Sequence, residues 1–173
     1  EKENNLVDID PFTVFGLFNK RITDRNRTKI LDIVTKLFDF KSKVPTSFDG
    51  LPVLNNQNAT YYRFVDKRND EDIDDLWSLF ISAIEYDKNP TGENKEKFSH
   101  YFDIVNNQIG NANSKITMGL FWIASDTFLN LDKRNQWYIL ESGKIPSEII
   151  ESLPSIDSKI SSAKYFKIIE VMR

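Results

Sequence analysis

The 173-residue chain has 40% hydrophobic residues, among them 13 phenylalanines, so it can fold as one domain around an aromatic core. Cysteine is absent, which excludes disulfides, thiolate metal sites and a cysteine nucleophile, and fits a cytoplasmic location. The net charge of −3 argues against a globally basic nucleic-acid binder, and no apolar run approaches the ~18 residues of a membrane span, so no membrane partner is expected.

The N-terminal third is predicted to begin with an unstructured segment and to contain one helix. Residues 1–9 are polar and acidic, and we expect a flexible start. Apolar residues recur at helical spacing over 24–40, where Thr23 or Asp24 is a suitable N-cap, so a helix is predicted there. Residues 44–56 contain two prolines and an Asp-Gly pair, which are typical of turns.

The middle of the chain is predicted to contain a strand and two helices. Aromatic and branched residues over 59–65 favour a strand. A helix is expected from Asp70 or Asp72 to Asp87, and another over 93–109.

Two further strands and two further helices are expected in the remainder. Residues 116–123 are apolar at both alternating sets of positions, which predicts a strand covered on both faces, and 127–131 resembles a second strand. A short helix is expected over 132–140 and a C-terminal helix over 158–173. This order predicts an α+β class: a single compact domain with several helices packed on a small mixed or antiparallel sheet and a C-terminal helix.

The residues that most enzyme classes require are missing. His100 is the one histidine, so neither a His-based metal triad nor a Ser-His-Asp triad can be assembled. The six glycines do not form a phosphate-binding motif, and no cofactor is expected. The acidic run between Asp70 and Asp75 lacks the spacing of a calcium loop and is explained by its place at a helix start. The sequence therefore favours recognition over catalysis, with no catalytic and no metal-binding residue predicted.

Positive charge is concentrated near the N-terminus. Residues 19–43 carry eight cations against three aspartates. Such a cluster can contact phosphates even in an acidic protein, although a solvated basic rim, with Arg27 paired internally to an aspartate, explains it as well. Trp122 could help wall a pocket for a planar base, or could belong to the core. The residues predicted to bind nucleic acid are Lys20, Arg21, Arg25, Arg27, Asn55, Asn56, Trp122, Lys133, Arg134 and Asn135.

Several separated motifs resemble a known family. They are Asp10-Pro-Phe-Thr-Val-Phe-Gly-Leu-Phe-Asn-Lys20, Thr23-Asp-Arg-Asn-Arg27, Phe48-Asp-Gly-Leu-Pro-Val-Leu-Asn-Asn56, Asp72-Ile-Asp-Asp-Leu-Trp-Ser-Leu-Phe80, and Ile116-Thr-Met-Gly-Leu-Phe-Trp-Ile123 with Phe128-Leu-Asn-Leu-Asp132. Together they resemble the N-terminal region that precedes the AAA+ GTPase module in bacterial McrB-like restriction subunits.

The resemblance implies a targeting role. In such systems the N-terminal region recognises nucleic acid, often with a modified base, while the AAA+ module hydrolyses GTP and an McrC-type nuclease subunit cuts. We accordingly expect a recognition domain over 10–140 and, over 141–173, a loop and C-terminal helix leading toward an AAA+ module of a longer parent chain. An McrC-type subunit and ring assembly would be partners of that parent.

Two hypotheses about function remain open from the sequence. The first is a non-catalytic domain that recognises nucleic acid, with DNA as the expected ligand, in an anti-phage restriction system. The second is a module that binds protein, either a partner or a phage protein, which suits the negative net charge and apolar richness.

Overall fold

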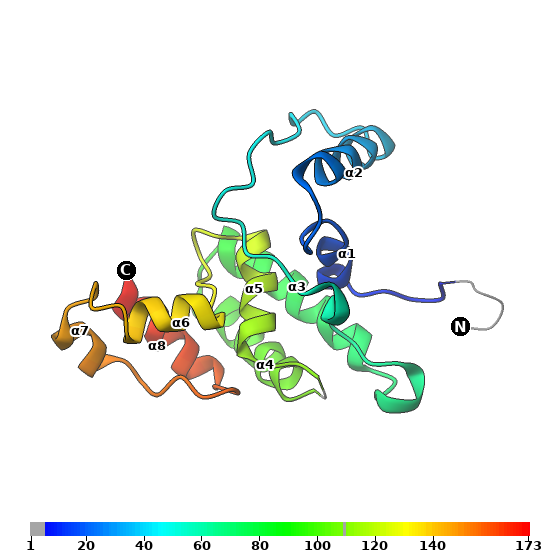
Figure 1. The fold of residues 1–173 in the computed structure, drawn as a ribbon. Coiled ribbons are helices and arrows are strands. Elements are labelled where there is room, and N and C mark those ends of the chain that lie inside the picture. The colour runs from blue at the N-terminus through cyan, green and yellow to red at the C-terminus, as the bar shows by residue number, and fades with distance from the viewer. Residues whose placement is uncertain (1–5, 109) are drawn as a thin grey trace.

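The computed structural model describes residues 6–108 and 110–173, and within these ranges it contains eight α-helices and no β-strand (Figure 1). The helices are α1 (Pro11–Phe18), α2 (Asp24–Leu37), α3 (Asp72–Lys88), α4 (Gly92–Asn107), α5 (Asn113–Ile123), α6 (Lys133–Leu140), α7 (Ser147–Ser152) and α8 (Ser162–Met172). Two 3₁₀ turns, η2 (Asn56–Asn58) and η3 (Val65–Lys67), lie between α2 and α3. The predicted α+β fold is therefore wrong, and the domain is all-α.

The predicted strand over 116–123 is instead the larger part of α5. An apolar run on both faces of a strand cannot be distinguished by periodicity from a helix that is buried on all sides. In α5 the consecutive residues from Lys115 to Leu120 are all buried. Burial all round, rather than a sheet, explains the continuous apolar pattern.

The other two predicted strands, over 59–65 and 127–131, are irregular segments. Their backbone groups bond to side chains and turns where a sheet would supply neighbouring strands. The Tyr61 N–H donates to Thr13 Oγ1 at 2.8 Å, and the Leu131 N–H donates to Thr117 Oγ1 at 2.9 Å. Aromatic and branched residues such as Tyr61, Phe128 and Leu131 anchor these segments in the core. Composition alone does not distinguish such anchoring residues from residues of a strand.

The long helices were predicted nearly in place. The expected helices over 24–40, 72–87, 93–109, 132–140 and 158–173 correspond to α2, α3, α4, α6 and α8, and Thr23 is the N-cap of α2. Residues 1–5 of the predicted flexible start, and Ile109 at the predicted end of α4, lie outside the described residues. None of the helices described is both long enough and apolar enough to cross a membrane.

The core is assembled around α5. Phe12 of α1 and Tyr61 stack at 5.4 Å between ring centroids, and Gly119 on α5 lies directly against both side chains. On the other side, Phe98 of α4 stacks on Phe128 at 5.0 Å. Residues of α3, α4, α5 and α8 contribute to the same buried cluster, so α5 is enclosed by the rest of the chain.

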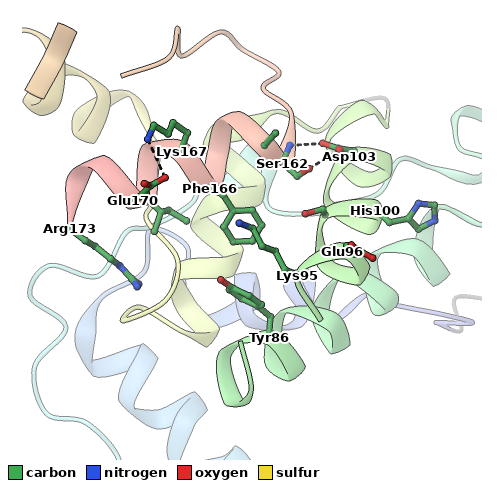
Figure 2. Close-up of a pocket in the computed structure, with 13 residues that line it drawn as sticks. Tyr86, Lys95, Glu96, His100, Asp103, Ser162, Phe166, Lys167, Glu170 and Arg173 are labelled. Carbon is green, nitrogen blue, oxygen red and sulfur yellow. Dashed lines mark hydrogen bonds and ion pairs between the residues drawn. The ribbon is translucent and has the colours of Figure 1, made fainter. Parts of the chain in front are cut away.

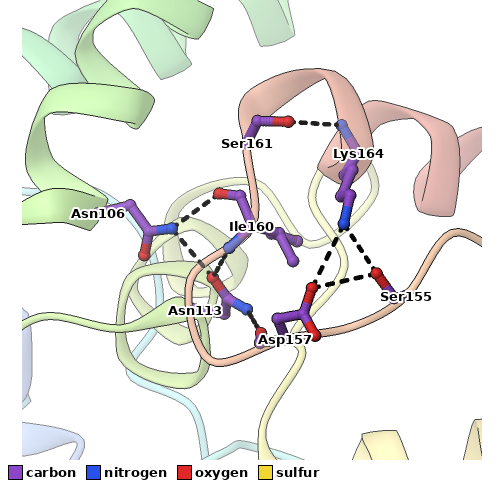
Figure 3. Close-up of polar contacts among 7 residues, drawn as sticks. All are labelled: Asn106, Asn113, Ser155, Asp157, Ile160, Ser161 and Lys164. Carbon is purple, nitrogen blue, oxygen red and sulfur yellow. Dashed lines mark hydrogen bonds and ion pairs between the residues drawn. The ribbon is translucent and has the colours of Figure 1, made fainter.

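The C-terminal segment, expected to lead toward a further module, is part of this core. Tyr165 of α8 is fully buried and stacks on Phe102 of α4 at 5.0 Å. Figure 3 shows the buried amides that anchor the approach to α8: Asn113 Oδ1 accepts from the Ile160 N–H at 2.8 Å and from Asn106 Nδ2 at 3.0 Å. These hydrogen bonds, together with one from Asn106 Nδ2 to the Ile160 carbonyl at 2.9 Å, fix the path of residues 155–161 across α4 and α5.

Helix α2 stands apart from the other helices, joined to them by α1 and by the long 38–55 connection (Figure 1). Of its residues, all of which the structure describes, only Arg27 is buried. The apolar residues that predicted this helix are thus partly or fully exposed, and Ile33, Leu37 and Phe38 are the exposed ones.

Replacing Gly119 by alanine tests the packing around α5. An added Cβ would lie 2.6 Å from the Phe12 ring and 3.1 Å from the Tyr61 hydroxyl oxygen. Overpacking of a core costs about 1 to 3 kcal/mol, which exceeds the helix-propensity gain of up to about 1 kcal/mol. G119A should therefore lower the free energy of unfolding by about 1 to 2 kcal/mol in urea titrations.

The matched control is G92A at the first residue of α4, where an added Cβ meets nothing within 4 Å. G92A should leave stability unchanged or raise it slightly. Equal stability of G119A and wild type would contradict the packing described around α5.

Candidate functional site

A polar pocket of about 340 Å³ brings together three of the residues predicted to bind nucleic acid. Arg21 comes from the turn after α1, whereas Arg134 and Asn135 come from the first turn of α6. The loop 50–53 forms the facing wall. The lining residues are Arg21, Gly50, Leu51, Pro52, Val53, Asn130, Asp132, Arg134 and Asn135.

Helix α5 holds two walls of this pocket. The Trp122 indole N–H donates to the Pro52 carbonyl at 2.9 Å, which fixes the 50–53 loop. One turn and a half earlier, Thr117 Oγ1 accepts from the Leu131 N–H at 2.9 Å and donates to the Asn113 carbonyl at 2.7 Å. Because Thr117 and Leu131 are buried, these bonds fix the residues on either side of Leu131, Asn130 and Asp132, at the pocket.

The backbone of Arg21 is held by the segment that follows the 50–53 loop. The Leu54 N–H donates to the Asn19 carbonyl at 2.9 Å, and the Arg21 N–H donates to the Leu54 carbonyl at 3.2 Å. Asn56 Nδ2 then donates to the Arg21 carbonyl at 3.1 Å. The arginine therefore projects from a fixed backbone, although its side chain is exposed.

The start of α6 forms the remaining wall. Asp132 is the N-cap, and its Oδ1 accepts from the Asn135 N–H at 2.9 Å. Asn130 Nδ2 donates to Asp132 Oδ2 at 3.0 Å, and Asn135 Nδ2 donates to the Asn130 carbonyl at 2.9 Å. These internal bonds fix the orientation of the two amide side chains, and the Arg134 guanidinium is the charged donor of this wall.

Charge in the pocket favours an anion. Neither Arg21 nor Arg134 has a side-chain hydrogen bond or ion pair with another described residue, and both are exposed. The single lining carboxylate, Asp132, accepts a hydrogen bond at each oxygen. Two unpaired guanidinium groups present planar sets of donors that suit phosphate or carboxylate oxygens.

Arg27, also predicted to bind nucleic acid, has a structural position. It is 4% exposed, and it donates from Nε to the Phe18 carbonyl at 2.7 Å and from Nη2 to the Lys20 carbonyl at 3.1 Å. Its Nη1 pairs with Asp24 Oδ1 at 3.0 Å. The internal pairing with an aspartate that the sequence left open is therefore present, and Arg27 joins α1 to α2 instead of facing a ligand.

The other predicted residues lie outside the pocket lining. Arg25 and Lys133 are exposed cations, and Lys20 is half-buried; the side chains of all three lack a partner among the described residues. Asn55 Oδ1 accepts from the Gln57 N–H and caps η2. Trp122 is half-buried and does not line the pocket, so its role here is to hold the 50–53 wall.

Sequence reasoning missed the 50–53 loop, and it quoted Asn130 and Asp132 without assigning them to the site. The sequence signal for this loop was its turn-forming composition. That composition predicts irregular backbone but does not indicate which part of the chain the loop contacts. Long-range bonds place it opposite α6: Trp122 holds Pro52, and the backbone of Asn19 and Arg21 holds Leu54.

Comparison with known proteins identifies a family for the whole chain. Residues 1–173 match the family described as "Domain of unknown function (DUF8425)". The chain belongs to the DUF8425 family. No curated protein and no solved structure matches it.

A larger groove on this DUF8425 domain lies between α4 and α8, with a volume of about 890 Å³ (Figure 2). Phe166 packs edge-on to Tyr86, and Lys95 Nζ lies 4.6 Å from the centre of the Phe166 ring. The charges in this groove balance: three cations, Lys95, Lys167 and Arg173, accompany Glu96, Asp103 and Glu170. The smaller pocket is therefore the better anion site, despite the larger volume of the groove.

The DUF8425 domain also buries an amine that could suggest a reactive lysine. Burial lowers the pKa of the Lys115 ammonium to about 8. Attraction to Asp10 opposes this shift, and a smaller repulsion from Arg63 adds to it. Lys115 Nζ donates to the Thr60 carbonyl and lies 5.0 Å from the centre of the Tyr61 ring. The adjoining cavity is about 20 Å³, room for no more than a water molecule, so Lys115 has a structural role.

This lysine predicts a pH dependence of stability. Its pKa is lower in the folded chain than the usual 10.5, so between pH 8 and 10.5 the unfolded chain binds more protons. The unfolding free energy should therefore rise with pH in this window, because the cost of burying the charged ammonium is then relieved. From about pH 7.5 to about pH 9.5, wild type should gain about 1 to 2 kcal/mol relative to K115M in urea titrations. Parallel pH responses of the two proteins would contradict the burial of a charged Lys115.

Proposed function

We propose that this DUF8425 domain binds nucleic acid without cleaving it, holding a phosphate group between Arg21 and Arg134. The observation that supports this most strongly is that two unpaired guanidinium groups, far apart in the sequence, line one polar pocket. Charge-assisted hydrogen bonds from arginine to phosphate are among the strongest polar contacts in proteins.

Further cations close in sequence to the two pocket arginines favour a polymer over a small anion. Arg25 lies four residues after Arg21, in the first turn of α2, and Lys133 adjoins Arg134 in the sequence; both are exposed. A polyanion that crosses the pocket would contact several of these cations at once, and each contact contributes through the release of counterions. The pocket lining supplies hydrogen-bond donors for an anion but contains no histidine, serine or threonine, which suits recognition rather than catalysis.

The resemblance to the targeting region of McrB-like restriction subunits supports DNA as the polymer. In that case the domain would select the target, and a GTPase module and an McrC-type nuclease would act elsewhere in the assembly. A preference for a modified base is part of the same proposal.

A protein-binding module is the second candidate function. It is favoured by the exposed apolar face of α2, which nucleic acid does not require.

The proposal predicts salt-sensitive binding that depends on the two pocket arginines. R21A/R134A should weaken binding to duplex or single-stranded DNA by about tenfold or more, and should lower the slope of log affinity against log salt by about 2, because two phosphate contacts are lost. Fluorescence anisotropy with plain and modified oligonucleotides at several salt concentrations measures both quantities.

A charge-matched control separates the effect of losing the pocket arginines from the effect of lowering the net charge. K88A/K167A also removes two exposed cations, one at the end of α3 and one on α8, away from the pocket lining. It should change affinity less than about twofold. Arg27 is left intact, because its removal would expose unpaired carbonyl groups between α1 and α2. Equal losses in the two double variants, or no binding at low salt, would contradict the proposal.

A further inference from the structure

Helix α2 and the residues after it present an apolar surface that the rest of the described chain does not cover. Four side chains on it are more than half exposed: Ile33 at 64%, Leu37 at 74%, Phe38 at 62% and Phe40 at 57%. Phe38 and Phe40 stack on each other at 5.6 Å between ring centroids. Exposed apolar side chains gathered on one helix end are typical of a docking surface. We call these four residues the α2 face.

The α2 face has a basic surround. Residues 24–43 contain six cations against three aspartates. Two of the cations, Lys36 and Lys41, form ion pairs with Asp32 and Asp39, whereas the side chains of Lys29 and Lys43 have no partner among the described residues. A partner of the α2 face should therefore combine apolar side chains with negative charge, and a symmetric pairing of two α2 helices would bring like charges together.

The chain itself carries a surface of that chemistry. Phe64 and Val65 are each 70% exposed. The following residues, 66–75, contain six carboxylates against two cations, and Asp66, Asp70, Glu71 and Asp74 are exposed. We call residues 64–75 the acidic segment. Its apolar pair beside exposed carboxylates is complementary to the apolar residues and lysines of the α2 face.

Within one molecule these two surfaces lie apart. Figure 1 shows α2 and the acidic segment, which includes η3 and the start of α3, on separate sides of the helical core. Contact between them therefore requires a second copy of the chain.

We propose that the α2 face of one molecule docks on the acidic segment of a second copy, giving head-to-tail association. Such a contact is heterologous: a head-to-tail pair keeps one free α2 face and one free acidic segment, at its two ends, so that association continues into an open chain or closes into a ring. Each contact buries a few apolar side chains and is steered by charge, so it should be weak and sensitive to salt.

Two surface variants and their mixture test the proposal. L37E/F38E disables the α2 face, and F64K/D70K disables the acidic segment; all four positions are exposed, so both variants should fold like wild type by circular dichroism. In sedimentation velocity, wild type should form species that grow with concentration and shrink with salt. Each variant alone should remain monomeric, because one half of every contact is missing.

The equimolar mixture distinguishes head-to-tail contact from other modes. Each variant retains the surface that the other lacks, so the mixture should form a one-to-one dimer and no larger species. The proposal would be overturned if wild type stayed monomeric up to its solubility limit. It would also be overturned if wild type self-associated while the equimolar mixture of variants remained monomeric. The assay contains no nucleic acid, so its outcome is independent of binding at the Arg21–Arg134 pocket.

Discussion

Burial of α5 is the constraint on which the rest of the domain depends. The helix has apolar residues on all sides, so it can be stable only where other segments surround it. Close approach at Gly119 admits Phe12 and Tyr61, while Thr117 and Trp122 bond to the backbones of the two loops beside it. The same bonds that complete the core therefore position the pocket walls. Damage to this packing should disturb the site even where no pocket residue is changed.

Charge is unevenly distributed over the domain. A net charge of −3 suggests little affinity for nucleic acid, yet the cations are not evenly placed. The pocket exposes two unpaired arginines, and the groove between α4 and α8 balances its cations with carboxylates. The acidic residues are concentrated instead at the start of α3. Local separation of charge thus allows an acidic protein to present an anion-binding surface.

The sequence was sufficient for the helices with clear periodicity and caps, such as α2 with Thr23 and α6 with Asp132. It failed for α5, because a continuous apolar run fits a buried strand as well as a buried helix, and that error produced the wrong fold class. Among the candidate site residues, charge clustering pointed to Arg21 and Arg134 separately. Their convergence on one pocket could not be predicted, because it depends on the long-range bonds of Trp122 and Thr117. The burial of Arg27 could not be predicted either, because it depends on contacts with the Phe18 and Lys20 carbonyls that no sequence pattern reveals.

The most direct test of this account is to locate bound DNA on the domain by NMR. Side-chain Nε–Hε signals of the arginines, together with backbone amide signals, would be followed while a short DNA oligonucleotide is added. The account predicts the largest shifts at Arg21, Arg134 and the 50–53 loop, with the Arg27 signal unchanged because its donors are bonded internally. Largest shifts along the α4–α8 groove, at Lys95 and Lys167, would contradict it.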